Sequence, residues 1–478
     1  MLESSSDTRH PSLLVLRLRQ SLICLGPVLI TISLGLAEGY SAILLPQLEE
    51  ESDWNIDTNL SSWIASIATL PMCVGCLLGG WLMEMIGRKM LHMLTCLPNL
   101  IGWLLIAFCG RSIAMLLAGR FLTGICIGIL SPVLTIYVAE ISDPVFRGFL
   151  SPTVILALNL GISIAHVMGT FVKWKLVALS ACIYPIACFV LLLFMPESPT
   201  YLIKKGKIDE AKIGFIWCRG NSKESTIELE FLISRQQQGT NSPKKTLMQH
   251  LEIFRNPTFY KPLLILLFFL SAMQCSGINP IAFYTVTILK EVLRNSTFNP
   301  YTSMLIMDGV RMIASILSCF GLQYLSRRLL MIISCSGSLI SLLILSVYLF
   351  ITHNYDLLND SDLSLIAVIS LVGYVLFSNL GLLPLPYAMS GELFASSSRG
   401  LGSGIASFCN MLQFFILIKI TPWLFKVLPT EAVFLLFGVC CLVGMIVLII
   451  VLPETRNKPL HEIENYFNGN KRSNSIYK

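Results

Sequence analysis

Two acid–base pairs with the same spacing could do electrostatic work in this chain. Glu140 precedes Arg147 by seven residues, Glu392 precedes Arg399 by seven, and a glycine follows each arginine. Carboxylates and guanidinium groups at the ends of apolar segments form reversible ion pairs rather than a reaction centre. An exposed pair contributes about 0–1 kcal/mol, so several together can hold a closed state that still opens. The pattern predicts a gate, and its repetition predicts two halves that move against each other.

Two further features repeat in the same order. Gly87-Arg88-Lys89 matches Ser326-Arg327-Arg328, and Pro196-Glu197-Ser198-Pro199 matches Pro453-Glu454-Thr455. A repeat of this kind is typical of a duplicated membrane carrier. We expect the charged residues to pair across the two halves when the inner side is shut and to part when it opens. The predicted inner-gate residues are Glu84, Arg88, Glu140, Arg147, Glu197, Arg327, Glu392, Arg399 and Glu454.

The composition is that of a membrane protein. Of 478 residues, 54% are hydrophobic and only 13% are charged, whereas soluble domains carry about 25% charged residues. Cys73 and Cys76 have the spacing of a metal or redox pair, but they lie in an apolar run without histidine or acid partners, so we expect buried thiols. No phosphate loop, nucleotide fingerprint or hydrolytic triad appears. We therefore expect no enzyme activity, no cofactor, no metal site and no nucleic-acid partner.

Apolar runs long enough to cross a bilayer, about 20 residues each, occur in two sets of six. They cover 22–45, 61–84, 90–109, 112–139, 150–171, 175–195, 261–289, 302–325, 329–352, 364–389, 400–424 and 430–452. The predicted fold is all-α, with twelve transmembrane helices in two pseudo-symmetric six-helix bundles. The expected domains are a tail at 1–20, a bundle at 21–195, a linker with short amphipathic helices at 196–260, a bundle at 261–452 and a tail at 453–478.

Basic residues set the expected orientation. The linker 196–260 is rich in Lys and Arg, whereas 46–60 carries five acids and neither Lys nor Arg. The positive-inside rule then places the linker and both tails in the cytoplasm, and we expect a plasma-membrane location. The glycosylation sequons at Asn59, Asn295 and Asn359 all fall in predicted outer loops.

Several motifs carry a family resemblance. The run from Gly79 to Lys89 is similar to an inner loop, with Glu84 where Asp is usual. The segment from Gly119 to Glu140 is similar to a fourth span, and Ser276-Gly277-Ile278-Asn279 to a seventh-span motif. Together with the Pro-Glu-Ser-Pro and Pro-Glu-Thr sequences, they resemble the sugar porters of the major facilitator superfamily over roughly 25–465. Ser62-Trp63-Ile64-Ala65-Ser66 is most similar to the insect trehalose-transporter branch.

The resemblance implies a sugar held near the bilayer midplane by amides and aromatic rings. It assigns binding positions to Gln274, Asn279 and Asn410, and aromatic gate positions to Tyr284 and Tyr387. The physical reason is that sugar hydroxyls need paired donors and acceptors, while rings stack on apolar sugar faces. For each of these residues, the alternative to sugar binding is an interhelical hydrogen bond or packing at a helix interface.

Three positions depart from the family pattern. Ile155 and Met273 stand where related porters have glutamine, and Arg311 stands where they have an uncharged amide. An arginine at membrane depth costs about 2.5–3.5 kcal/mol on insertion scales, so it needs a partner or water. Arg311 either pairs with Asp308 on its own helix or faces the cavity, where it would bind a sugar or a carboxylate.

A further acid lies in the first span. Proton-coupled relatives place an acid opposite the fourth-span arginine, which is Arg120 here, and the usual acid position aligns with Ser41. Glu38 lies three residues earlier, on nearly the same helix face. It either pairs with Arg120 and titrates, or it forms a static ion pair or lies near the outer mouth of the carrier. For the single histidines His92 and His166 we expect packing or a helix–helix hydrogen bond.

These features favour a facilitative carrier for a hexose or trehalose that works by alternating access in the lipid bilayer. The alternatives are proton-coupled sugar symport through Glu38 and Arg120, a porter-like receptor that binds without transporting, and an anion carrier selected by Arg311. The expected partner is a small-molecule sugar, and we expect the chain to function as a monomer.

Overall fold

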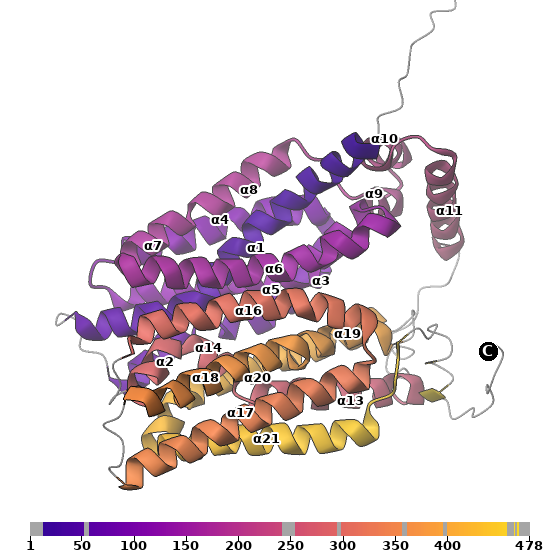
Figure 1. Ribbon diagram of the computed structural model, residues 1–478. Helices are drawn as coiled ribbons and strands as arrows, with labels where there is room; N and C mark the ends of the chain where they lie inside the picture. The colour runs from indigo at the N-terminus through magenta and orange to yellow at the C-terminus, as the bar shows by residue number, and fades with distance from the viewer. Residues whose placement is uncertain are drawn as a thin grey trace, which may run out of the picture.

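The computed structural model describes residues 13–51, 57–240, 254–293, 298–355, 361–394, 399–456, 463 and 466–467. Within these ranges the chain is helical and has no strand. Twelve segments of the described chain are long and apolar enough to cross a membrane, which confirms the predicted number. Figure 1 shows two bundles side by side, the first running from indigo to magenta and the second from orange to yellow.

The first bundle contains six spans, two of which are broken. Its helices are α1 (Leu13–Glu50), α2 (Thr58–Ser66), α3 (Leu70–Ile86), α4 (Arg88–Ala107), α5 (Ile113–Ile141), α6 (Pro144–Phe171), α7 (Trp174–Ala181) and α8 (Ile183–Leu193). The second span consists of α2 and α3, and the sixth of α7 and α8. Each break lies just before a proline, Pro71 or Pro185, whose ring favours an interruption of the helix.

The second bundle repeats this plan. Its helices are α13 (Pro257–Cys275), α14 (Ile278–Phe283), α15 (Thr285–Val292), α16 (Pro300–Tyr324), α17 (Arg327–Tyr355), α18 (Ser361–Phe377), the π-helical turn η1 (Ser378–Leu382), α19 (Pro384–Glu392), α20 (Arg399–Val427) and α21 (Thr430–Val451). The seventh span is formed by α13 to α15, and the tenth by α18, η1 and α19.

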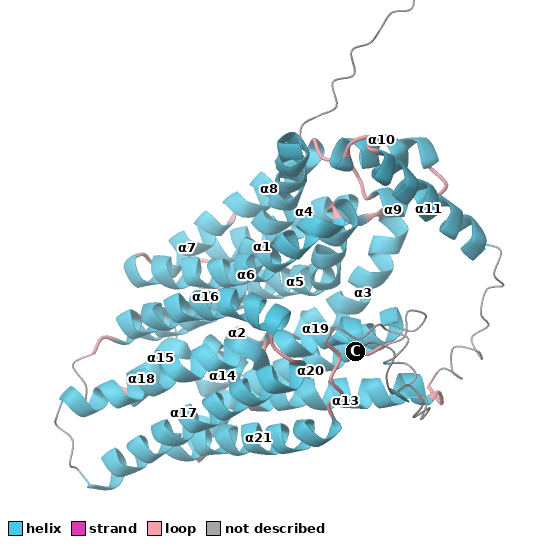
Figure 2. Ribbon diagram, turned by 45° about the vertical axis from the view of Figure 1, so that its right-hand side comes forward, coloured by secondary structure: helices cyan, strands magenta, loops and turns pink. Residues whose placement is uncertain are grey.

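The linker between the bundles forms the helices α9 (Pro199–Lys204), α10 (Ile208–Arg219) and α11 (Lys223–Thr240). They lie beyond the ends of the first bundle, as Figure 2 shows. Gln20 Nε2 donates to the carbonyl of Cys218 at 3.0 Å, and Arg219 donates to the carbonyl of Ser142 at 2.7 Å. The linker is therefore fastened to the first bundle. We call this end of the molecule the linker side and the other end the far side.

Close helix contacts depend on small residues. A Cβ added to Gly124 would come within 1.9 Å of the carbonyl oxygen of Ala68, and one added to Gly128 within 2.5 Å of that of Met72. No side chain fits at these points of α5. In lipid there is no hydrophobic drive between helices, so close backbone packing of this kind holds a bundle together.

The predicted span at 261–289 is present, and its helix breaks at Ser276 and Gly277. Gly277 has a φ of +85°, in the left-handed region that glycine adopts without strain. A Cβ on Gly277 would also lie 2.4 Å from the ring of Phe437. The break changes the direction of α14 relative to α13 and shapes the site described next.

Candidate substrate-transport site

Four of the sequence-predicted binding residues form one chain of hydrogen bonds. Asn279 Nδ2 donates to Gln274 Oε1 at 2.8 Å, Gln274 Nε2 donates to Asn410 Oδ1 at 2.9 Å, and Asn410 Nδ2 donates to the Tyr387 hydroxyl oxygen at 2.9 Å. We call these residues the amide relay. They come from α14, α13, α20 and α19, so the relay lies entirely in the second bundle.

The break at Gly277 makes the relay possible. Along an unbroken helix, residues five apart point about 140° away from each other. Gln274 and Asn279 are five apart and yet hydrogen-bond side chain to side chain. The left-handed residue between them therefore turns the Asn279 amide toward Gln274.

The relay runs from a buried interior to an accessible end. Gln274 and Asn410 are each only 1% exposed, Asn279 is half-buried, and the Tyr387 side chain is 44% exposed. Because the Tyr387 oxygen accepts from Asn410, its own proton remains to be donated to a solute hydroxyl. Asn279 and Tyr387 are thus the accessible ends of the relay, and hydrogen bonds from Gln274 and Asn410 hold them in place.

Tyr284 is not part of the relay. Its hydroxyl donates to the carbonyl of Ile418 at 3.0 Å, and the side chain is buried. It lies near Arg120 of the other bundle, close enough for the Arg120 charge to act electrostatically on the Tyr284 hydroxyl. Tyr284 therefore lies at the contact between the bundles, apart from the polar chain.

Pairing of Arg120 with Glu38 was one of the alternatives from sequence, and the described residues show no ion pair between them. The Arg120 guanidinium is fully buried and donates to the Ser41 hydroxyl and to the carbonyls of Ala37 at 2.8 Å and Ile64 at 3.4 Å. Among the described residues, no ion pair of Arg120 is present. The carbonyls of Ala37 in α1 and Ile64 in α2, together with the Ser41 hydroxyl, bind the guanidinium in place of an acid.

Arg311 is paired rather than free in the cavity. Its Nη1 lies 2.7 Å from Asp308 Oδ1 on the same helix, and Asp308 Oδ2 lies 2.6 Å from His166 Nδ1 on α6 of the first bundle. The Arg311 guanidinium also acts electrostatically on Glu38 of α1. We call Glu38, His166, Asp308 and Arg311 the bridge cluster. The helix-internal pairing of Arg311 was one of two alternatives from sequence. For His166 a helix–helix hydrogen bond was one of the expected contacts, but Asp308 was not identified as the partner.

The two apolar replacements lie in different surroundings. Met273 is fully buried in the second bundle, so it packs in the core and does not face a solute. Ile155 is 42% exposed and lies one turn before Asn159 on the same face of α6. Asn159 donates to Ser315 of α16 at 2.7 Å, so this face of α6 is directed at the second bundle. Only Ile155 changes the polarity of an accessible surface between the bundles.

The predicted gate residues of the first bundle form one cluster on the linker side. Arg88 lies 3.0 Å from Glu84 and 3.1 Å from Glu140. Glu197 accepts from the backbone N–H groups of Arg88 and Lys89, both at 3.0 Å. Its carboxylate therefore caps the N-terminus of α4, where unpaired N–H groups favour a negative charge.

The second bundle repeats this cluster except at Glu84, whose matching position is Gln323. Arg327 lies 2.7 Å from Glu392, and Glu454 accepts from the backbone N–H groups of Arg327 at 3.0 Å and Arg328 at 3.2 Å. Burial acts to raise the pKa of the Glu454 carboxyl, but these N–H donors, that of Arg456 and the Arg327 charge outweigh it and hold the pKa below its ordinary value. Glu454 thus caps α17 in its ionised form.

Each of these ion pairs lies within one bundle. The pairing across the bundles that we expect for a closed inner side stays a prediction. The side chains of Arg147 and Arg399 lie outside the described residues, as do Asn295 and Asn359. Asn59 is exposed in the first turn of α2, where its side-chain oxygen accepts from Lys419 at 3.2 Å.

Most of the chain matches a known family. The family model described as "Sugar (and other) transporter" matches residues 28–467. The chain belongs to this family. Membership places it among membrane transport proteins rather than enzymes.

Relatives and solved structures agree with this family. The Facilitated trehalose transporter Tret1-2 homolog of Drosophila simulans is 30% identical over 453 residues, which cover 94% of this chain and 91% of that protein. The Facilitated trehalose transporter Tret1 of Apis mellifera ligustica is 30% identical over 458 residues, covering 95% and 89%. The inward open conformation of the xylose transporter XylE from E. coli matches with a TM-score of 0.76 at 18% identity, covering 94% of this chain and 99% of that one. At that identity the likeness shows the shared fold.

The two bundles of this sugar transporter family member touch at the far side and in the middle. On the far side, Lys290 lies 2.9 Å from Glu50, and Lys419 donates to the Ser62 hydroxyl at 2.7 Å while lying 4.0 Å from the Trp63 ring centroid. Between described residues, the hydrogen bonds and ion pairs that cross from one bundle to the other lie in these regions and not at the linker-side clusters. The conformation is therefore closed at the far side.

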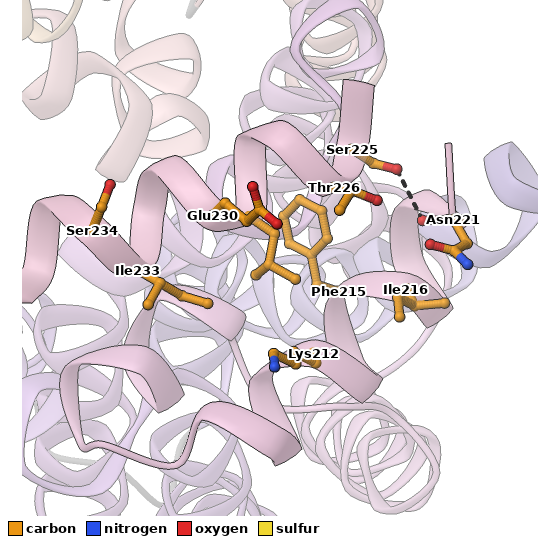
Figure 3. A pocket seen from close by; sticks show the side chains of 11 residues that line it. Lys212, Phe215, Ile216, Asn221, Ser225, Thr226, Glu230, Ile233 and Ser234 are labelled. Atoms are coloured by element: carbon orange, nitrogen blue, oxygen red, sulfur yellow. Dashed lines mark hydrogen bonds between the residues drawn. The ribbon is translucent and has the colours of Figure 1, made fainter. Parts of the chain in front are cut away.

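A hollow lies between α10 and α11 (Figure 3). Its lining includes Lys212, Phe215, Thr226, Glu230 and Ile233. All of its lining residues belong to the linker helices and the turn between them, outside the membrane spans, and none belongs to the amide relay. We therefore assign it no part in holding the transported solute.

Proposed function

We propose that this chain is a facilitative carrier that moves a neutral sugar across the plasma membrane by alternating access. The observation that carries the proposal is the amide relay, which combines two accessible polar ends with a buried support. Amides and a tyrosine hydroxyl in fixed positions match the alternating donors and acceptors of sugar hydroxyls. Family membership supports the same class of solute.

The conformation fits such a cycle. Bonds join the bundles at the far side, while the linker-side clusters are satisfied within each bundle. With the linker in the cytoplasm, as its basic residues predict, this is an inward-facing carrier. Opening the far side requires these few contacts between the bundles to break. A solute that binds both end states can remain bound during this change.

Trehalose and hexoses are the substrates we propose, because the relatives named above are described as trehalose transporters. A neutral solute is favoured because Arg311 is matched by Asp308 and lies near Glu38, so the bridge cluster offers no free positive charge. This argues against the anion carrier. All four relay residues come from one chain, which supports a functional monomer.

Uptake of radiolabelled trehalose and glucose into cells that lack their own sugar carriers tests the proposal. The chain should give saturable uptake that Tyr387→Phe reduces, with surface expression measured for both. Saturable binding with no flux, at confirmed surface expression, would replace the carrier with a porter-like receptor. The receptor alternative is suggested by Ile155, Met273 and the second-half loop with Gln323 and Ser326, and the buried position of Met273 removes one of these observations.

A further inference from the structure

The bridge cluster contains a buried titratable contact between the two bundles. His166 on α6 and Asp308 on α16 lie 2.6 Å apart, and both side chains are almost completely buried. The other ring nitrogen, His166 Nε2, lies 3.2 Å from the backbone carbonyl oxygen of Gly39 on α1. The sugar-binding relay does not use either residue.

These two contacts require one proton more than a neutral imidazole beside a carboxylate can supply. A carbonyl oxygen only accepts, so Nε2 must carry a proton to bond Gly39, and the Nδ1 of a neutral ring is then an acceptor. An ionised Asp308 is an acceptor as well. The 2.6 Å contact therefore needs a proton on Nδ1, which makes an imidazolium, or on the Asp308 carboxyl. In both cases the bridge has bound one proton.

The net charge of the groups around the bridge favours the binding of that proton. The groups that face it are Asp308 and Arg311 on α16 and Glu38 on α1, and Glu38 in turn acts on Tyr387 of α19. With the acids ionised and His166 neutral, the cluster carries one negative charge in excess. One added proton makes it neutral, which is the state that burial favours.

The position of the bridge ties it to the opening of the far side. Asn159 bonds Ser315 across the same two helices at 2.7 Å, seven residues nearer the linker side on each helix. Seven helical residues span about 10 Å. If the bundles rock about the middle contact, the Asn159–Ser315 contact stays near the pivot while His166 and Asp308 separate as the far side opens.

We propose that His166 and Asp308 form a proton-binding site, and that the bound proton holds the far side of the carrier shut. The proton comes from the aqueous solution, forms the N–H bond of His166 or the O–H bond of Asp308 that completes the bridge, and returns to the solution when the bridge opens. Because proton binding stabilises the far-side-closed state, acid slows the return to the far-side-open state. This inference rests on the proposed carrier cycle.

Sugar uptake at equal pH on both sides of the membrane tests the site. The useful range is about pH 5.5 to 8, the range in which histidine side chains of proteins act as pH switches. Initial uptake by the wild-type chain should fall about fivefold or more across that range as the pH is lowered, a coupling at the lower end of those between binding sites. His166→Gln should flatten this profile to within about twofold of its value at pH 8.

His92→Gln is the matched control. His92 is also a buried histidine, but its Nδ1 faces the carbonyl of Arg88 within its own helix rather than an acid of the other bundle. Its replacement should leave the shape of the pH profile unchanged. If Glu38→Gln flattens the profile and His166→Gln does not, the proton binds at Glu38 and the proposal is overturned.

A conformational measurement separates this proposal from the carrier function. Spin labels on Lys173→Cys and Thr302→Cys, both exposed at the far side, report the distance between the bundles, with the labelled wild-type chain as background for its 15 cysteines. Acid should favour the short distance in the wild-type background but not with His166→Gln. This shift without sugar flux would sustain the proton site and refute the carrier function. Sugar flux with neither a pH-dependent rate nor a pH-dependent distance would support the carrier function and refute the proton site.

Discussion

Replacing Gln274 with leucine isolates the contribution of the amide relay. Gln274→Leu keeps a side chain of similar size but removes both of its hydrogen bonds, at 2.9 Å to Asn410 and 2.8 Å to Asn279. The Asn410 oxygen then lies unpaired in a site only 1% exposed. A buried polar group left without a partner costs about 1–3 kcal/mol.

Part of that cost falls on sugar binding, because Asn279 and Tyr387 are held in place through Gln274 and Asn410. If about 1.4–2.8 kcal/mol is lost in the solute-bound state, the apparent KM for uptake rises about 10- to 100-fold. The assay is concentration-dependent uptake of the radiolabelled sugar, normalised to the amount of carrier at the cell surface.

Ser271→Ala provides the matched control. Ser271 accepts from Gln413 at 2.9 Å, between the same two helices and three residues from Gln274, but outside the relay. Its loss should change the KM by less than about twofold, since a single interhelical hydrogen bond in a membrane averages about 0.6 kcal/mol. An unchanged KM in Gln274→Leu, or equal effects of the two variants, would refute the reasoning that links the relay to the solute.

Three further outcomes are expected. Gly277→Ala should abolish uptake and lower the thermal stability of the purified protein, because Gly277 has a φ of +85° and an added Cβ would lie 2.4 Å from Phe437. Gly404→Ala should be tolerated, because there is open space around Gly404. Equal thermal stability of the two variants would contradict this prediction. Tyr387→Phe should raise the KM about tenfold with little change in thermal stability, as expected for a lost donor at an accessible position. Because the pKa of Glu454 is lowered by folding, its stabilising effect is present above the ordinary value of about 4.3 and is lost as the pH falls through the lower folded value. Glu454→Gln should therefore lower the melting temperature at pH 7 and weaken its fall in acid, and parallel melting curves for variant and wild type would count against the capping role.

Hydropathy predicted the spans well because the bilayer requires long apolar runs whatever the tertiary contacts. The breaks were harder to predict. The left-handed turn at Gly277 depends on packing against Phe437, a residue 160 positions later in the chain, and periodicity carries no trace of such a contact. The same limit applies to His166 and Asp308, whose pairing depends on how the two bundles face each other.

The relay shows a different limit. Resemblance selected its four residues one at a time, but it carried no information on which of them are buried. That Gln274 and Asn410 support Asn279 and Tyr387 follows only from the bond directions. For Arg311 the i, i+3 spacing to Asp308 left two alternatives, because a local pair and a cavity-facing charge have the same sequence signature.

The separate charge clusters have a practical consequence for the integrity of the carrier. Arg88 and Arg327 each find their acids within their own bundle, and the linker helices are bonded to the first bundle through Cys218 and Arg219. These ion pairs and hydrogen bonds would remain if the chain were cut after Thr240. A gene divided between Thr240 and Phe254 should therefore yield two polypeptides that insert independently and, when co-expressed, reassemble into a working transporter.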